Sequence, residues 1–508
     1  MTRTGARAAL AAAVTMSLAL VPGSRPVHAA PSPDVVTSPD VTFIQNIPLP
    51  VTGIGGAVVG NRFYLTSYVD IEIFDITDTA NPVLLGKVPV NVERENEEVQ
   101  TNGRILAVGS SMGCQYYTPG EPLGTADGRW EGTPVSCLEL FDVRDPRNPT
   151  FLTHVMGAGQ HTITCIFDCD YMWGQYGGEV VDTRHVFDAG HPAPIIGNWI
   201  DNLPTLPVDC PGGQGDDPAT HTCKLSKSQC HNVVQVSPGL MFAACQPILL
   251  LSVRPQDGGS VTHPKLLMYG LGGRGGFVHG VQWPSAGTDT FALVGGETNG
   301  TPRCDQTVSL PAVFATWVRS GPSTLREVGE FTLHDGMYSD GNPPAHTLGC
   351  SVHWFHAHPT FHNGGLVSLA AYDNGNRFVR VKPDGSITEV GWFNRPNAST
   401  WASYWAPDQR TVYVVDDYRG FDVIRYTGDL YAGSAVAPVT GGSAAGAGTT
   451  ASPAAAGGVT TPNTAASAAA TGAGTAGVAL LLVLGFSARR RLRRRWPRTQ
   501  TTGSIREL

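Results

Sequence analysis

The sequence is poor in charge, and it has no long hydrophobic run outside its two ends. Charged residues make up 15% of the 508 residues. Only two segments are apolar enough to cross a membrane, and both lie at the ends of the chain, so a polytopic membrane protein is excluded. A Gly-X-Y period is absent, which excludes collagen, and the 61 glycines and 38 prolines disfavour long helices and coiled coils. Because 41% of the residues are hydrophobic, a sizeable core can still form. These features favour a turn-rich β protein.

Several catalytic motifs are also missing. No Gly-x-Ser-x-Gly elbow precedes a helix, and no His-Glu-x-x-His occurs, so a serine hydrolase and a zinc protease lack their main support. Paired Cys-x-x-Cys knuckles are absent, which disfavours a structural zinc site. The glycine-rich run at 272–276 leads into a strand pattern without a Lys-Ser/Thr pair, and therefore does not indicate a nucleotide loop.

The N-terminal segment has the pattern of a secretory signal peptide at residues 1–30. Arg3 and Arg7 precede an apolar run at 8–21, and the segment ends in the small residues of His28-Ala29-Ala30. The mature chain is expected to start near Pro31. The protein is therefore predicted to be exported.

The C-terminal region divides into three parts. Residues 432–470 are almost wholly Ala, Gly, Ser, Thr, Pro and Val and predict a flexible stalk. Residues 471–488 predict a single hydrophobic anchor helix, and the arginine-rich tail at 489–508 is expected to lie in the cytoplasm. The layout resembles the cell-wall sorting tails of Gram-positive surface proteins, with Thr461-Pro462-Asn463-Thr464-Ala465 in place of Leu-Pro-x-Thr-Gly. Anchoring at the cell surface is expected, either in the membrane or, after sortase cleavage, in the cell wall.

The charge of the body differs from that of its ends. Of the 34 basic and 42 acidic residues, eleven basic residues and one acidic residue lie in 1–30 and 489–508, which leaves the body near −18. Such a surface repels phosphate backbones, so nucleic-acid binding is not expected. A negatively charged surface of this kind attracts cations, so cations are more suitable partners than nucleic acids.

Ten cysteines occur, and all of them lie between Cys114 and Cys350. An even set in an exported protein favours structural disulfides over thiol chemistry. The sequence leaves the pairing open. Nearest-neighbour pairing gives Cys114–Cys137, Cys165–Cys169, Cys210–Cys223, Cys230–Cys245 and Cys304–Cys350.

A strand-turn-strand unit repeats through the body. Residues 71–85 recur as 138–152, each with alternating hydrophobic residues up to an Asp, followed by an Asp-x-x-Asn-Pro turn and a second strand. Weaker copies follow at 186–197, 378–391 and 421–426. Short strands in units of this kind, separated by Gly/Pro/Asp turns, are typical of propeller blades.

The repeat resembles the LVIVD repeat family, and this resemblance implies a β-propeller over residues 41–430. Seven units are predicted, opening near Gly55, Glu98, His161, His231, His279, His353 and Trp401. The last unit has room for only three strands, whereas residues 41–48 resemble the closing strand at 82–89. The fold predicted is therefore an all-β, seven-bladed propeller closed by an N-terminal strand, which also removes exposed sheet edges.

Four successive units begin with a histidine, namely His161, His231, His279 and His353, and Glu98 occupies the matching place in the second unit. The innermost strand of each blade lines the propeller axis, so these side chains are expected to converge. Imidazoles at one end of a channel are a candidate site for copper, zinc or iron. Alternatively, each histidine hydrogen-bonds a carbonyl of a neighbouring blade, or the ring holds water.

A distant similarity to the propellers of methanethiol oxidase, formerly called selenium-binding proteins, implies a copper-dependent oxidase. The similarity is too distant to assign any catalytic residue of those oxidases to a position in this sequence. The primary function expected is that of an extracellular binding module for a protein, a glycan or a cation. The alternative is an oxidoreductase that uses copper or another divalent transition metal, and a purely structural surface-layer role is the third. Whether the protein is an enzyme stays open at this point.

Overall fold

The computed structural model describes twelve stretches of the chain, all between residues 35 and 432. They are residues 35–49, 53–67, 70–89, 99–110, 136–208, 216–217, 219–225, 229–270, 277–297, 313–333, 351–395 and 398–432. The predicted signal peptide, hydrophobic segment and basic tail lie outside the described residues, as does the stalk beyond Ala432. In this described part of the chain, none of the helical segments could span a lipid bilayer.

The fold is nearly all β, as predicted, and most sheets contain four antiparallel strands. The first sheet consists of β3 (Gly53–Val59), β4 (Arg62–Ser67), β5 (Asp70–Asp75) and β6 (Val83–Pro89). The second consists of β7 (Gln100–Thr101), β8 (Ile105–Ser110), β9 (Cys137–Asp142) and β10 (Thr150–Met156). The third consists of β11 (Ile163–Ile166), β12 (Tyr171–Gly174), β13 (Glu179–Asp182) and β14 (Ile195–Asn198). A small pair, β15 (Asp216–Asp217) and β16 (Thr222–Cys223), follows.

The next two groups of four strands join into one eight-stranded sheet. One group is β17 (Cys230–Ser237), β18 (Leu240–Cys245), β19 (Ile248–Ser252) and β20 (Lys265–Gly270). The other is β21 (Phe277–Gln282), β22 (Ala292–Glu297), β23 (Val313–Arg319) and β24 (Thr324–Thr332). Their outer strands β20 and β24 pair in parallel, through Tyr269 with Thr324 and Gly270 with Leu325.

The last two sheets each take a strand from the N-terminal part of the described chain. β25 (Phe355–Ala357), β26 (Gly365–Ala370), β27 (Asn376–Val381) and β28 (Ile387–Asn394) pair in order, and β1 (Val36–Thr37) adds to β28. β29 (Thr400–Trp405), β30 (Thr411–Asp416) and β31 (Gly420–Tyr426) are completed by β2 (Val41–Ile47). The register runs from Val41 opposite Tyr426 to Ile47 opposite Phe421, so the prediction that residues 41–48 complete the last unit is confirmed.

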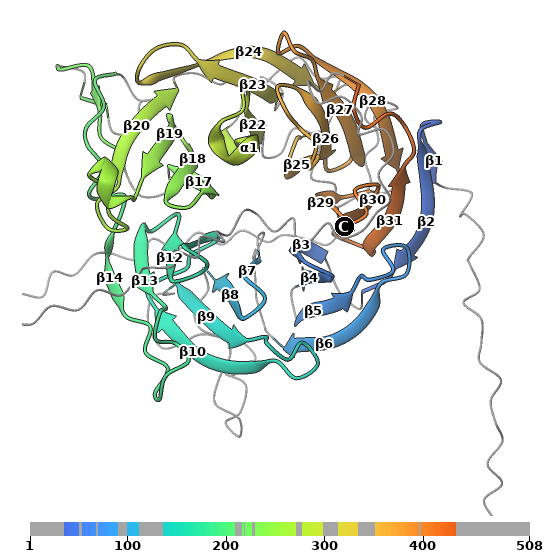
Figure 1. The fold of residues 1–508 in the computed structure, drawn as a ribbon, viewed down its shortest axis with the longest axis horizontal. Coiled ribbons are helices and arrows are strands. Elements are labelled where there is room, and N and C mark those ends of the chain that lie inside the picture. Colours follow the sequence, from blue (N-terminus) through green and yellow to red (C-terminus); the bar gives the residue numbers. More distant parts are fainter. Residues whose placement is uncertain are drawn as a thin grey trace, which may run out of the picture. The chain divides into compact units, whose positions relative to one another are not determined.

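The first strands of these strand groups contact one another in sequence order. β3 contacts β7, and the series continues through β11, β17, β21, β25 and β29, which in turn contacts β3. Figure 1 shows the sheets side by side around a common centre, with the first strands innermost. Residues at the beginning of each first strand are therefore brought near one axis.

The repeated Asp-x-x-Asn-Pro segment forms the same turn in the first and second sheets. The carboxylate of Asp78 accepts hydrogen bonds from the backbone N–H of Ala80 at 3.1 Å and from the Asn81 amide at 2.8 Å. In the second copy, Asp145 accepts a 2.8 Å bond from the Asn148 amide. Side-chain hydrogen bonds to nearby backbone groups favour turns over strands. They explain why neither β5 nor β9 continues into its Asp-x-x-Asn-Pro segment.

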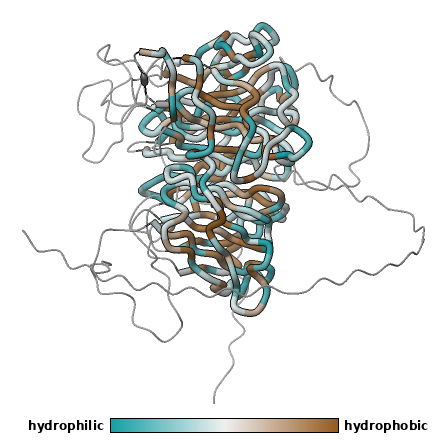
Figure 2. The backbone as a smooth tube through the Cα atoms, turned by 90° about the vertical axis from the view of Figure 1, so that its left-hand side faces the viewer, coloured by the Kyte–Doolittle hydropathy of each residue, from teal (hydrophilic) through white to brown (hydrophobic). Residues whose placement is uncertain are grey.

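Hydrophobic side chains fill the space between adjacent sheets. Figure 2 shows hydrophobic residues mainly along the inner part of the backbone and hydrophilic residues at many of its outer bends. Phe63 on β4 is fully buried and joins the first sheet to the last, because its ring lies 5.0 Å from that of Tyr413 and 5.2 Å from that of Phe421. The ring of strands is thus closed by side-chain packing as well as by the β2–β31 pairing.

Two disulfides match the nearest-neighbour pairs expected from the sequence. Cys165 bonds to Cys169, and Cys230 bonds to Cys245 across the β17–β18 pair. Cys137 and Cys223 are also disulfide-bonded. The four remaining cysteines, Cys114, Cys210, Cys304 and Cys350, lie outside the described residues.

The contact between the first and last sheets makes Phe63 a test of ring closure. Phe63→Ala is expected to lower the free energy of unfolding by about 3–5 kcal/mol, because it removes a fully buried ring and leaves a cavity between the sheets. Urea unfolding followed by circular dichroism measures the change. As a control, Val83→Ala at a side chain that is 60% exposed on β6 should change stability by less than about 0.5 kcal/mol. Equal losses for the two variants would contradict the proposed closing role of Phe63.

Candidate metal centre

Four histidines lie at the beginnings of successive first strands. His231 and His279 lie within β17 and β21, while His161 and His353 come two residues before β11 and β25. His231, His279 and His353 are buried, and His161 is half-buried. Glu98, the candidate from the second unit, lies outside the described residues.

The four imidazoles form a row in the order of the chain. The centroids of the His161 and His231 rings are 4.7 Å apart, those of His231 and His279 are 3.9 Å apart, and those of His279 and His353 are 4.3 Å apart. His161 Nε2 and His231 Nε2 are 2.7 Å apart, which is a hydrogen-bonding distance. Rings from four separate strands therefore meet in a row.

Backbone carbonyls on the next first strand along the chain orient two of these rings. His231 Nδ1 lies 3.2 Å from the carbonyl oxygen of His279, and His353 Nδ1 lies 2.7 Å from that of Trp401. A carbonyl only accepts hydrogen bonds, so each Nδ1 carries the proton, and in the neutral ring each Nε2 keeps its lone pair. Metal-binding histidines in proteins are commonly fixed in this way by a bond from the other ring nitrogen.

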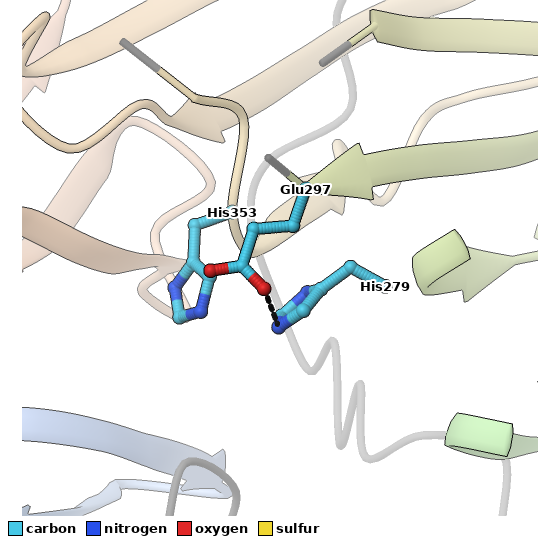
Figure 3. A group of neighbouring side chains, drawn as sticks. All are labelled: His279, Glu297 and His353. Carbon is cyan, nitrogen blue, oxygen red and sulfur yellow. Dashed lines mark ion pairs between the residues drawn. The ribbon is translucent and has the colours of Figure 1, made fainter. Parts of the chain in front are cut away.

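A buried carboxylate lies among the rings. Glu297 ends β22 and is 6% exposed, and its Oε2 lies 3.8 Å from His279 Nε2. Figure 3 shows the carboxylate between the rings of His279 and His353. One potential ligand atom from each of these three residues lies within 4.8 Å of the others.

The sequence reasoning missed Glu297, although a positional signal for it exists. Within an antiparallel pair the end of the second strand lies beside the beginning of the first, and Glu297 is the register partner of Phe277, two residues before His279. Tyr372, two residues after β26, lies at the corresponding place beside His353. A search for polar side chains at the ends of second strands would have found both residues.

Aromatic side chains surround the imidazoles. The Trp354 ring lies 4.9 Å from that of His279, and the Trp401 ring lies 5.1 Å from that of His353. Both indoles are 6% exposed, and Tyr176 packs against His161 at 4.8 Å. These rings reduce access of water to the cluster, which strengthens electrostatic interactions inside it.

The donor atoms suit a transition metal. Bonds from imidazole nitrogen or carboxylate oxygen to such ions are about 2.0–2.2 Å, so two ligands of one ion lie at most about 4.4 Å apart. The trio of His279, Glu297 and His353 needs to contract only slightly from its 4.8 Å span to meet that limit. Two imidazoles and one carboxylate fit copper, iron or zinc, and the described cluster contains no thiolate.

Two further histidines, one within β25 and one directly after it, have a different role. His356 Nδ1 lies 2.7 Å from the carbonyl oxygen of Ser403, and His358 Nε2 lies 2.8 Å from that of Gln409. Burial lowers the pKa of each imidazole to about 4, so both are neutral near pH 7. They join the sheet of β25–β28 to that of β29–β31 through backbone contacts.

No protein-family model matches the chain, and no curated protein matches it significantly.

The half-buried His356, whose ring nitrogen bonds the Ser403 carbonyl, is expected to make stability depend on pH. An unfolded histidine has a pKa near 6.5, so below that value the unfolded chain takes up a proton that folded His356, with its pKa of about 4, does not. The contribution of neutral His356 to the free energy of unfolding is therefore fully present above pH 6.5 and is lost as the pH falls towards 4. The stability advantage of the wild type over His356→Gln should therefore shrink by about 2–4 kcal/mol between pH 7 and pH 4, measured by urea unfolding. An advantage that stays constant over this range would contradict the assignment.

Proposed function

We propose that this protein is a seven-bladed β-propeller that binds a divalent transition-metal ion at its axis through His279, Glu297 and His353. The seven first strands in mutual contact support the blade count, and β2 supplies the outer strand of the last blade. The observation that carries the metal site is the meeting of two imidazoles and a buried carboxylate within 4.8 Å, with the His353 ring oriented by a backbone carbonyl. His231 and His161 lie next in the row as further candidate ligands.

Copper is the ion that we favour. Imidazole and carboxylate donors bind copper more tightly than the other divalent metals of the first transition row. The distant resemblance to copper-dependent propeller oxidases points in the same direction. The ion would supply redox chemistry towards a small molecule, and the aromatic side chains around it would limit the access of water. The enzymatic part of the proposal thus rests on the metal site.

The location of the protein is part of the same proposal. Disulfides form and persist in oxidising compartments, and the described part of the chain contains two complete pairs. Together with the signal-peptide pattern at 1–30 and the tail pattern at 432–508, they support a protein that is exported and held at the cell surface.

Binding of an extracellular protein or glycan is the second candidate function. It is favoured by large hydrophobic side chains that are exposed on the outer strands β6, β10 and β14. They are Val83, Leu84, Met156, Ile195 and Ile196. Each of these strands lies at the opposite edge of its four-stranded sheet from the first strand, so polar substitutions there would impair this function without changing metal content.

Metal content is the direct test of the proposed site. The purified chain, dialysed against copper, iron and zinc in turn, is expected to retain close to one ion per molecule. His279→Ala combined with His353→Ala should abolish retention, because both variants remove imidazole ligands. Elemental analysis by mass spectrometry measures the ratio.

The control is His154→Ala, which removes an exposed imidazole from β10. It should leave the metal content unchanged, and circular dichroism should show that every variant is folded. Absence of metal from the folded wild type, or equal retention by wild type and the axial double variant, would show that the cluster is a structural hydrogen-bonding network.

A further inference from the structure

Tyr372 has an unusual backbone conformation. Its φ is 39°, in the left-handed region that a bulky aromatic residue rarely adopts because the conformation is strained. Two backbone hydrogen bonds of 3.0 Å with Thr400, one in each direction, hold it there, and the side chain is 4% exposed. Such strain is found mainly where a side chain must be placed for function.

The strained backbone places the Tyr372 side chain against two residues of the candidate metal centre. Its hydroxyl donates a 2.6 Å hydrogen bond to Glu297 Oε1, and its ring stacks on the His353 ring with centroids 4.6 Å apart and planes inclined by 28°. Tyr372 follows β26, whereas Glu297 belongs to β22 of the preceding sheet. One side chain thus connects two candidate ligands that come from different sheets.

We propose that Tyr372 is a positioning residue that fixes Glu297 as a one-oxygen ligand of the axial metal ion. The Tyr372 hydroxyl donates a hydrogen bond to Oε1 of Glu297. The other carboxylate oxygen, Oε2, lies towards His279 Nε2 and is free to bind the ion. A bond to one carboxylate oxygen both orients the group and reduces its freedom to rotate or to bind the ion through both oxygens. This inference rests on the proposed function, because it assigns a role within the same site.

A purely structural role for Tyr372 predicts something different. In that case its hydroxyl would stabilise the fold, and its loss would weaken metal binding to the same extent whether or not Glu297 is present. A positioning role predicts that the effect of the hydroxyl disappears once its partner carboxylate has been removed. A double-mutant cycle separates the two possibilities.

The experiment uses the full chain, with Cu(II) as the probe. Tyr372→Phe keeps the ring and removes the hydroxyl, and it is combined with Glu297→Ala. Copper affinity is measured by competition with a chelator, and the ligand environment by electron paramagnetic resonance. We expect Tyr372→Phe alone to weaken binding about 10- to 100-fold and to change the copper spectrum, since loss of an outer-shell partner has effects of this size. In the Glu297→Ala background it should change neither.

Tyr404→Phe is the matched control. Tyr404 is also a buried tyrosine near the axis, but its hydroxyl accepts a hydrogen bond from the backbone N–H of Gly56 at 2.7 Å. Its loss should leave copper affinity and the spectrum unchanged. If Glu297→Ala does not fold, Glu297→Gln takes its place in the cycle, with a reduced effect of Tyr372→Phe as the expected result.

The outcomes distinguish this inference from the proposal on which it rests. A folded wild type that binds no copper overturns both. Copper binding by the wild type, together with equal effects of Tyr372→Phe in both backgrounds or an unchanged spectrum, overturns the positioning role alone. Loss of the Tyr372 effect in the absence of Glu297 supports it.

Discussion

The contact between β29 and β3 completes the ring of first strands, and the geometry of the axial cluster depends on that ring. Each first strand is held by its own group of four strands, but the distance between histidines on different first strands depends on how neighbouring groups pack. Packing of Phe63 against Tyr413 and Phe421 and pairing of β2 with β31 fix the last of these interfaces. An open arrangement would let the sheets spread and would separate the imidazoles.

The cluster itself carries a desolvation cost that local hydrogen bonds offset. Polar groups as deeply buried as His279, His353 and Glu297 are costly unless they have partners. The Trp401 carbonyl accepts from His353, and the Tyr372 hydroxyl donates to Glu297, so the same bonds that reduce this cost also determine the direction of the donor atoms. Stability and ligand orientation are therefore coupled at the axis.

The sequence predicted the fold more fully than the site, for physical reasons. Strand alternation and Asp-x-x-Asn-Pro turns are local patterns, so the strand units and the closing role of residues 41–48 could be predicted from them. The histidines were found because each begins a unit. Glu297 and Tyr372 were not, because their proximity to the histidines arises from antiparallel pairing and from contacts between sheets. The LVIVD-repeat resemblance stays a prediction, and Glu98 lies outside the described residues.

The pairing of β2 with β31 also determines when the fold can be finished. Val41 and Tyr426 are register partners although almost the whole body of the chain separates them. At a synthesis rate of roughly 5–20 residues per second, on the order of 20–80 s passes between the emergence of one strand and that of its partner. During most of that interval the strands that β2 joins have not been made, so its backbone hydrogen-bonding groups have no partner strand. Assembly of the axis is therefore a late event, and the growing chain needs protection from aggregation until its final strand is available.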